Sequence, residues 1–268
     1  MKFDLHTHHE RCGHATGSVE EYIQSAIRAG LDVIGISDHS PFYAMEDDHP
    51  SPGSAMAISH FPQYVKEVLQ LKEKYEAKIE VLLGVESDYF PKHEALYRRH
   101  YSQYPFDYLI GSVHFINGFH LFHKKRWIGG DDRTKSEDKE LYYQSIQQSA
   151  RSGMFDIIGH LDALKGFFPT WNEVHADLPD RTLKVIAECG LAIEVNTSGM
   201  RKPCKQWFPA DELLERAFYY NIPVTFGSDA HTPEHVGLER ELVAKRLKEI
   251  GYKEWVFFWR RSRQTVAL

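Results

Sequence analysis

Seven short apolar segments with the character of β-strands run through this chain, and metal-capable side chains follow six of them. These side chains are histidines, aspartates and a glutamate: Asp4, His6 and His8; Asp38 and His39; Glu86; His114; His160; and Asp229 and His231. Helical patterns separate most of the segments, which is typical of parallel strands joined by helical crossovers. Because parallel strands end at the same edge of a sheet, we expect these side chains to meet at one polynuclear metal site.

The number of segments predicts an α/β fold of roughly seven strand–helix units. An open doubly wound sheet has the same alternation, but it gathers its site at a single switch point. Ligand candidates after almost every strand instead favour a barrel, whose strand ends all converge on one mouth. We therefore predict a closed or nearly closed TIM-like barrel of roughly seven units, with the metal site at the C-terminal ends of the strands. Residues 42–59 and 117–133 are predicted to be loops over that mouth.

Length and composition favour a single domain over residues 1–268. No low-complexity linker divides the chain, and the ligand candidates extend from His6 to His231, so a division of the chain would divide the site. A net charge of -6 argues against a general nucleic-acid binder. No apolar run approaches the ~18 residues that a membrane-spanning helix needs, and the first strand leaves no room for a signal peptide. Three cysteines without paired spacing fit the reducing cytoplasm.

Local signals predict several element boundaries and one strand orientation. A capping-box pattern at residues 18–21 opens a helix, and a similar pattern at residues 134–137 opens another. Thr232 and Pro233 are expected to begin the last long helix, as its N-cap and first helical residue. On the strand over residues 191–196, the apolar positions should pack outward against helices. Glu194 and Asn196 would then face inward.

None of these signals is specific by itself, since one His-x-His pair arises easily by chance in a chain with 16 histidines. A lone glutamate or histidine after a strand is more often hydrogen-bonded than metal-bound. Their shared position changes the interpretation, because burial of so many polar groups without compensation costs roughly several kcal/mol each, and metal ions supply that compensation. Nine further histidines lie in predicted loops or helices and are expected at the surface: His9, His49, His60, His93, His100, His120, His123, His175 and His235.

The order of these motifs resembles that of the polymerase-and-histidinol-phosphatase (PHP) superfamily over essentially the whole chain. The matching motifs are His6-Thr7-His8, Asp38-His39, Glu86, Ser112-Val113-His114, Gly159-His160 and Asp229-Ala230-His231. Residues 8–15 and 196–203 look like those of the monofunctional histidinol-phosphatase branch, and no polymerase segment accompanies them. The resemblance implies a distorted (βα)7 barrel and a centre of two or three divalent metal ions, which would be zinc, manganese or iron.

The resemblance also implies how nine ligands divide among the metals. In that division, the first metal takes His6 and His8 with Glu86 and Asp229 as bridging carboxylates, the second takes Glu86, His114 and His160, and the third takes His14, His39 and His231. Many members of the superfamily carry an acidic residue near position 14, where this chain has a histidine. Asp38 is expected to orient His39 or to relay a proton.

Phosphate recognition requires cationic side chains at the mouth of such a barrel. Arg201 follows the strand that bears Glu194, and a guanidinium binds phosphate bidentately, so Arg201 is the first candidate. Lys165, a few residues beyond His160, is the second, although an exposed surface charge explains it equally well. Arg11 is the third.

We therefore expect a metal-dependent phosphomonoesterase that hydrolyses L-histidinol phosphate to L-histidinol and phosphate, a step of histidine biosynthesis. A solvent molecule between two metals would act as the nucleophile. Two alternatives stay open at this point: a PHP-type nucleotide phosphatase or exonuclease, and a metal-binding PHP module that lacks catalytic activity. The expected partner is a small phosphomonoester rather than nucleic acid or a membrane, and the sequence does not indicate an oligomeric state.

Overall fold

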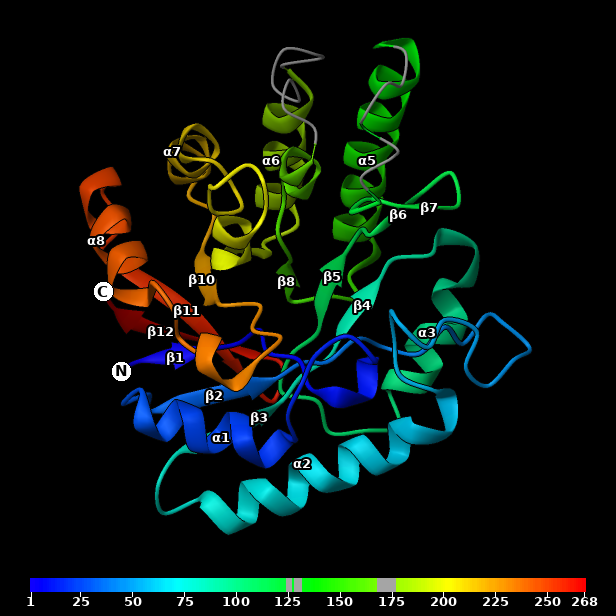
Figure 1. The fold of residues 1–268 in the computed structure, drawn as a ribbon. Coiled ribbons are helices and arrows are strands. Elements are labelled where there is room, and N and C mark those ends of the chain that lie inside the picture. Colours follow the sequence, from blue (N-terminus) through cyan, green and yellow to red (C-terminus); the bar gives the residue numbers. More distant parts are fainter. Residues whose placement is uncertain (124–126, 128–131, 168–176) are drawn as a thin grey trace.

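The computed structural model describes residues 1–123, 127, 132–167 and 177–268. Within these residues, eight parallel strands form two sheets, one of three strands and one of five, and helices pack around them (Figure 1). The strands are β1 (Phe3–Asp4), β2 (Val33–Ile36), β3 (Glu80–Leu83), β4 (Glu86–Asp88), β5 (Ile110–Ser112), β8 (Ile157–Ile158), β9 (Ala192–Asn196) and β10 (Val224–Gly227). The helices are α1 (Val19–Arg28), α2 (Phe61–Tyr75), α3 (Glu94–Tyr101), α5 (Asp132–Ser152), α6 (Asp177–Glu188), α7 (Asp211–Tyr219) and α8 (Arg240–Ile250).

Strands β3 and β4 are two parts of one segment, and the strand that we predicted there is interrupted. β3 pairs with β2, whereas β4 pairs with β5, so the strand order is β1-β2-β3 before the interruption and β4-β5-β8-β9-β10 after it. An isolated parallel bridge between His39 and Glu86 keeps β4 aligned with the continuation of β2. The interruption follows Gly84, where the ring of Tyr108 lies so close that a Cβ would approach its Cζ to 2.3 Å.

Hydrogen bonds also join the segment of β1 to that of β10, which are the outer strands of the two sheets. The Leu5 N–H donates to the Phe226 carbonyl at 3.1 Å, and an isolated parallel bridge continues this pairing beyond the two strands. The buried carboxylate of Asp4 accepts the backbone N–H of Ser228 at 2.9 Å, so a side chain supplements the few ladder bonds. The assembly is the distorted barrel that we predicted, with parallel strands throughout.

The apolar core has two parts that share the same strands. One part lies between α1, α2 and side chains of β2 and β3 such as Ile34 and Val81. The other part takes the alternate residues of those strands, such as Val33 and Leu82, together with Tyr108. Successive side chains of a strand point to opposite faces, which is why Val33 and Ile34 belong to different parts of the core.

The first helix begins where the capping pattern predicts, but two other helix starts differ. Ser18 and Glu21 form both hydrogen bonds of the capping box of α1. α5 begins at Asp132, two residues before the predicted cap. Thr232 precedes only a short 3₁₀ helix, η6 (Pro233–His235), and α8 begins later, at Arg240. The backbone turns left-handed in between, with a φ of 69° at Gly237, so a continuous helix from Pro233 is excluded.

One of the two predicted loops agrees with the structure, and the other agrees only in part. Residues 42–59 contain no strand or α-helix in the described structure, as expected, and end in the 3₁₀ helix η2 (Ile58–His60). The prediction for residues 117–133 is wrong in part, because β7 (Phe119–His120) pairs with β6 (Phe115–Ile116) in an antiparallel hairpin. Residues 124–126 and 128–131 of that predicted loop lie outside the described residues.

The aromatic segment after α8 belongs to an antiparallel hairpin of β11 (Glu254–Trp259) and β12 (Ser262–Ala267), which lies beside β10 (Figure 1). Trp255 is 1% exposed, and its ring packs 4.9 Å from that of Phe3 in β1. The hairpin therefore contributes to the core next to β1 and β10. None of the described helices has the length and apolar character to cross a bilayer.

Candidate metal centre

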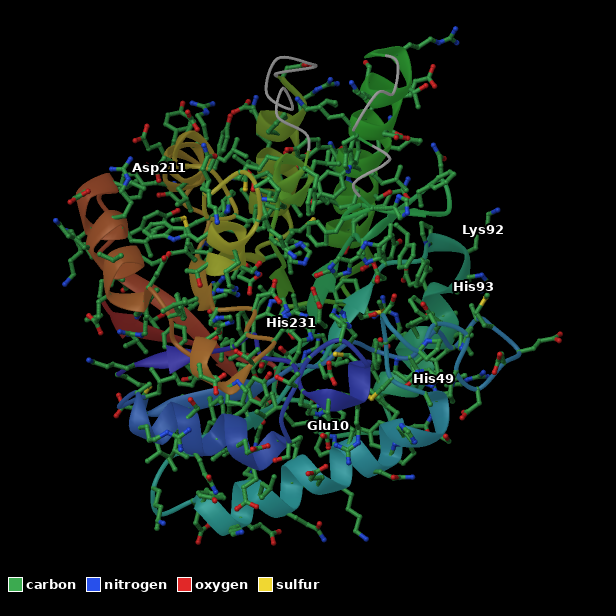
Figure 2. All side chains as sticks on the ribbon, in the orientation of Figure 1. Glu10, His49, Lys92, His93, Asp211 and His231 are labelled. Carbon is green, nitrogen blue, oxygen red and sulfur yellow. The ribbon has the colours of Figure 1, made fainter. Side chains whose placement is uncertain are left out.

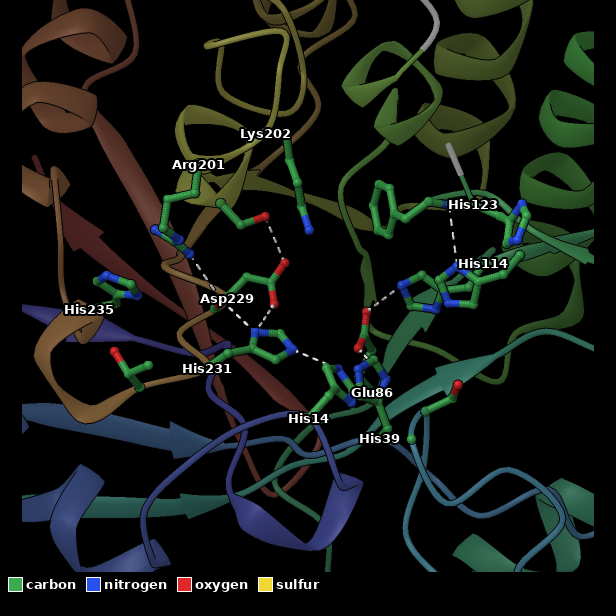
Figure 3. A pocket seen from close by; sticks show the side chains of 16 residues that line it. His14, His39, Glu86, His114, His123, Arg201, Lys202, Asp229, His231 and His235 are labelled. Carbon is green, nitrogen blue, oxygen red and sulfur yellow. Dashed lines mark hydrogen bonds and ion pairs between the residues drawn. The ribbon is translucent and has the colours of Figure 1, made fainter. Parts of the chain in front are cut away.

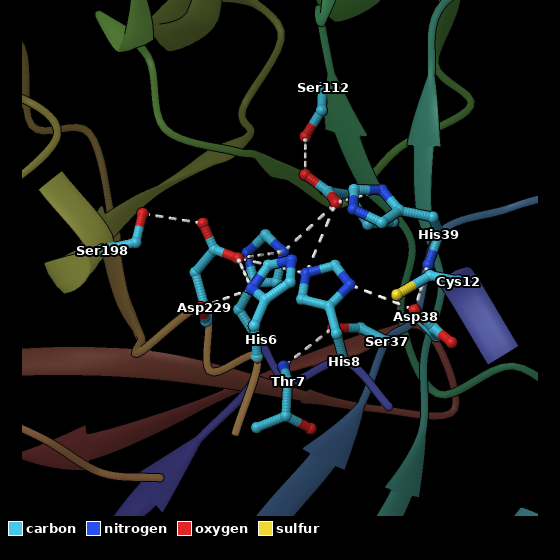
Figure 4. A network of polar contacts seen from close by, with 12 residues as sticks. His6, Thr7, His8, Cys12, Ser37, Asp38, His39, Ser112, Ser198 and Asp229 are labelled. Carbon is cyan, nitrogen blue, oxygen red and sulfur yellow. Dashed lines mark hydrogen bonds and ion pairs between the residues drawn. The ribbon is translucent and has the colours of Figure 1, made fainter. Parts of the chain in front are cut away.

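Four buried side chains from three parts of the barrel meet at the first cluster of the candidate site. His6 and His8 follow β1, Glu86 begins β4 and Asp229 follows β10. The Nε2 atoms of His6 and His8 lie 3.4 and 3.6 Å from Glu86 Oε2. Asp229 Oδ1 lies 3.1 Å from His8 Nε2 and 3.8 Å from His6 Nε2 (Figure 4). Two imidazoles and two carboxylates at such separations suit one tetrahedral or five-coordinate metal ion.

The second cluster uses the other oxygen of the same glutamate. Glu86 Oε1 lies 2.9 Å from His160 Nε2 and 3.5 Å from His114 Nε2, and both histidines follow barrel strands. The hydroxyl of Ser112 donates to this oxygen at 2.7 Å. A carboxylate with one oxygen in each cluster has the geometry of a bridge between two ions.

The third cluster brings together His14, His39 and His231. The Nε2 atoms of His14 and His231 are 2.9 Å apart, and the imidazole rings of His14 and His39 lie 5.1 Å apart (Figure 3). His39 Nδ1 also reaches Glu86 Oε2 at 2.9 Å, so this cluster adjoins the first. His231 lies toward the middle of the molecule, whereas Lys92 and His93 lie at its edge (Figure 2). All nine predicted ligands are therefore brought to one region.

The donor atoms of these clusters fit metal ions because several of them have no other partner. His6 Nε2, His8 Nε2 and Glu86 Oε2 are buried and form no hydrogen bond within the described structure. A buried polar atom left in that state costs roughly 1–3 kcal/mol, so three of them in contact need a ligand that replaces water. Imidazole nitrogens and carboxylate oxygens are the donors that zinc, manganese and iron accept.

A second layer of acidic side chains orients the histidines. His6 Nδ1 lies 2.6 Å from Glu194 Oε1, and His114 Nδ1 lies 3.2 Å from Asp88 Oδ2. Asp88 also accepts the backbone N–H of His114 at 2.6 Å. A carboxylate on Nδ1 fixes the tautomer that leaves the Nε2 lone pair for a metal. Glu194 faces inward, as strand alternation predicts, although its partner is not evident from sequence.

Asp229 is held by polar side chains of β9 and of the segment that follows it. Asn196 donates to Asp229 Oδ2 at 3.2 Å, and the hydroxyl of Ser198 donates to the same oxygen at 2.8 Å. The amide of Asn196 also donates to Glu194 at 3.0 Å. One oxygen of Asp229 is thus anchored, and the other remains directed at His6 and His8.

Asp38 belongs to this supporting layer and does not line the cavity. Its carboxylate is fully buried, with Oδ1 at 3.2 Å from His8 Nδ1 and Oδ2 at 2.7 Å from His9 Nδ1. It accepts the backbone N–H of His39 at 2.9 Å, so it does position His39, but its side-chain partners are His8 and His9. The geometry supports the positioning role that we weighed for Asp38, and the proton-relay role stays a prediction.

Mutual charges set the protonation of the cluster. Burial by itself would raise the pKa of Glu86, but His6, His39 and His114 hold that pKa well below its usual range. Burial lowers the pKa of His14 to about 4, with a further contribution from nearby His39. At neutral pH, Glu86 is therefore a carboxylate and His14 a neutral imidazole, which are the forms that bind metals.

A cavity of 530 Å³ opens over the three clusters, and Arg201 is the predicted cation that lines it. Arg201 Nη2 donates to the carbonyls of Ser228 and Asp229 at 2.8 and 3.0 Å, and Nη1 has no hydrogen-bond partner in the described structure. Loop 42–59 reaches this cavity through Gly53 and Ser54, as expected for a loop over the mouth.

The other two predicted phosphate-binding residues lie elsewhere. Lys165 is 2% exposed and forms a buried ion pair with Asp162 at 2.8 Å. Arg11 pairs with Glu67 of α2 at 2.6 Å. Neither side chain lines the cavity, so the structure does not bring them to the candidate site.

Several histidines that we expected at the surface take part in the site region. His120, His123 and His235 line the cavity, and His9 is fully buried beside Asp38. Burial, with His114 nearby, lowers the pKa of His120 to about 4. Loop histidines carry no periodic signal, so only the folded hairpin of β6 and β7 reveals this position. His175 lies outside the described residues.

A barrel with a histidine-rich polynuclear site at the carboxyl ends of its strands has the architecture of a metal-dependent hydrolase. Comparison with protein-family models identifies a PHP domain over residues 4–198 and a PHP-associated region over residues 213–248. The chain belongs to the PHP family. The expectation drawn from its motifs is therefore confirmed.

Relatives with curated names match the chain over almost its whole length. A probable histidinol-phosphatase of Deinococcus radiodurans is 34% identical over 263 residues, which are 96% of this chain and 97% of the relative. The histidinol-phosphatase of Bacillus subtilis is 29% identical over 270 residues, which cover 92% of this chain and 99% of that protein.

Solved structures share the fold. A histidinol phosphate phosphatase from Lactococcus lactis, complexed with zinc, L-histidinol and phosphate, matches with a TM-score of 0.82 at 21% identity and 98% coverage of both chains. A putative histidinol phosphatase from Listeria monocytogenes matches with a TM-score of 0.79 at 25% identity, covering 90% of this chain and 99% of the other.

Proposed function

We propose that this protein is a histidinol-phosphatase, which hydrolyses L-histidinol phosphate to L-histidinol and inorganic phosphate. The observation that carries the proposal is the convergence of buried donor atoms without hydrogen-bond partners on one cavity, which Arg201 also lines. The name shared by relatives that match the chain over nearly its full length supports the substrate. Two or three divalent ions (zinc, manganese or iron) are the proposed cofactors.

The proposed roles of the chain's own residues follow from their contacts. Glu86 would join two ions through its two oxygens, while Glu194 and Asp88 keep the imidazoles of His6 and His114 oriented. Metals held there supply Lewis acidity, which activates a solvent molecule near neutral pH. Arg201 would bind the phosphoryl group from the cavity wall.

The proposal extends to organisation and location. The hydrogen bonds between the segments of β1 and β10 support a single domain over residues 1–268. The three cysteines are free, which supports the cytoplasmic location that we expected from their spacing. A small phosphomonoester, rather than nucleic acid, is the proposed partner.

The decisive experiment is metal analysis of the purified protein together with hydrolysis of three substrates, measured as phosphate release from L-histidinol phosphate and AMP and as nucleotide release from an oligonucleotide. We expect kcat/KM for L-histidinol phosphate to exceed the values for AMP and for a single-stranded oligonucleotide. Equal or faster hydrolysis of a nucleotide would overturn the assignment in favour of a PHP-type nucleotide phosphatase. Full metal content without turnover of any phosphomonoester would indicate a silent metal-binding module.

Arg201→Ala provides a second test of the site. We expect it to keep the metals and to raise KM for L-histidinol phosphate by roughly 10- to 100-fold, because a charge-assisted hydrogen bond to phosphate is lost. Metal content and steady-state kinetics measure the two effects separately. An unchanged KM would remove Arg201 from the binding site.

A further inference from the structure

A lysine that the sequence analysis did not single out reaches into the cavity. Lys202 follows directly after η5 (Thr197–Arg201) and lines the cavity together with Glu86 and Asp229. Its side chain points into the cavity from the side opposite His14 and His39 (Figure 3). The ammonium group therefore lies across the cavity from the third metal cluster.

The ammonium group of Lys202 lacks a carboxylate partner of the kind that Lys165 and Arg11 have. Lys165 is paired with Asp162 and Arg11 with Glu67, whereas no carboxylate of the described residues forms an ion pair with Lys202. Its Nζ atom lies over the ring of Phe122, 4.5 Å from the ring centroid. Burial lowers the pKa of this lysine. A half-buried ammonium that faces a cavity and forms no ion pair is suited to bind an anion.

The neighbouring arginine does not duplicate this position. Arg201 commits Nη2 to the carbonyls of Ser228 and Asp229, which ties it to the segment after β10. Lys202 has no such backbone anchor among the described residues, and its four-carbon stem lets Nζ adjust to a bound group. Among the described residues that line the cavity, one is an arginine, Arg201, and one is a lysine, Lys202.

We propose that Lys202 binds the phosphoryl group of the substrate, as a second cationic contact beside Arg201. The proposal rests on the proposed function and extends it. Charge complementarity selects the phosphoryl group, because the other polar groups of L-histidinol phosphate are an ammonium group and an imidazole, and neither attracts a lysine.

The test measures inorganic phosphate binding to the metal-loaded, desalted protein by isothermal titration calorimetry. For Lys202→Met we expect phosphate affinity to fall by about tenfold or more, as for loss of a charge-assisted hydrogen bond, with unchanged metal content and thermal midpoint. Lys202→Arg should retain most of the affinity. Lys205→Met is the matched control, because Lys205 lies three residues away and is exposed outside the cavity.

Two results would overturn the proposal. Unchanged phosphate affinity in Lys202→Met would leave the lysine with only its contact to Phe122. Unchanged affinity combined with slower turnover of histidinol phosphate, but not of p-nitrophenyl phosphate, would assign Lys202 to the leaving oxygen instead. Phosphate binding is measured in the absence of histidinol phosphate, so the two proposals can fail separately. If phosphate affinity depends on Lys202 but the protein does not hydrolyse histidinol phosphate, the role of Lys202 is supported and the proposed substrate is refuted.

Discussion

The carboxyl ends of the strands and the barrel interior below them differ in whether their buried polar atoms have hydrogen-bond partners. Below, the hydroxyl of Tyr108 crosses to β1 and donates to the Leu5 carbonyl at 2.5 Å, while its ring lies against Gly35 and Gly84. At the strand ends, His6 Nε2 and Glu86 Oε2 are as deeply buried but have no hydrogen-bond partner.

In the barrel interior the protein itself supplies the hydrogen-bond partner of a buried polar atom, whereas at the strand ends a ligand has to supply it. The Tyr108 contact is satisfied within the protein, so it contributes to folding stability without any cofactor. At the strand ends, Glu194, Asp38 and Asp88 orient the imidazoles of His6, His8 and His114, but His6 Nε2, His8 Nε2 and Glu86 Oε2 have no hydrogen-bond partner in the described structure. Substitutions in the two regions should therefore affect different measurable properties.

The largest effect is expected for Glu86→Gln, since an amide cannot replace a carboxylate that serves two clusters. We expect kcat/KM for histidinol phosphate to fall on the order of 10³-fold or more, equal to about 4 kcal/mol, with loss of bound metal. His231→Ala should likewise lose metal and activity. Glu80→Gln is the control, because Glu80 lies on β3 with a side chain 44% exposed. Full activity in either site variant would contradict the site.

Removal of metal should destabilise the wild-type protein almost as strongly. If metals bind only the folded chain, saturation at 100–1,000 times Kd adds about 3–4 kcal/mol to the free energy of unfolding. Thermal unfolding with and without a chelator measures this difference. Glu86→Gln should show a much smaller shift on chelation, and an equal shift in both proteins would place the bound metal elsewhere.

An intermediate effect is expected for Glu194→Gln, which keeps the size of the side chain but removes the anionic partner of His6. Loss of such a partner typically costs about 10- to 100-fold in metal affinity. Competition with a chelator measures the affinity. Glu188→Gln, at the exposed end of α6, is the control. An unchanged affinity would show that the tautomer of His6 does not depend on Glu194.

The smallest effect is expected for Tyr108→Phe, in the barrel interior, where the hydroxyl is hydrogen-bonded within the protein. It leaves the Leu5 carbonyl without its hydroxyl donor and should lower the free energy of unfolding by about 1–2 kcal/mol. Metal content should stay the same. Urea unfolding measures the change, with Tyr219→Phe as a control because Tyr219 is 68% exposed. Metal loss in Tyr108→Phe would mean that the two regions are coupled.

Much of the site could be predicted because its ligands follow strands, and strand alternation has a simple period. His6 and His8 share a face for that reason, and Glu194 turns inward for the same one. The resemblance of the motifs then allowed His14 to be added, although its position after a short 3₁₀ helix, η1 (Glu10–Cys12), has no such period.

Two of the errors concern contacts that have no local signal. The ion pair of Arg11 with Glu67 joins residues far apart in the chain, so the sequence could not show that Arg11 is already paired. Lys165 is different, since Asp162 lies only three residues away and their ion pair could have been predicted from that spacing. His120 reaches the cavity through a hairpin that residue types alone did not predict.

Because β1 bonds to β10, the metal centre draws on segments at opposite extremes of the described chain. A growing polypeptide that still lacks residues 224–231 has His6 and His8 but neither Asp229 nor His231 to complete their surroundings. Ion capture at full affinity must therefore wait until residues 224–231 have been synthesised, and a product that ends before them would hold metal poorly.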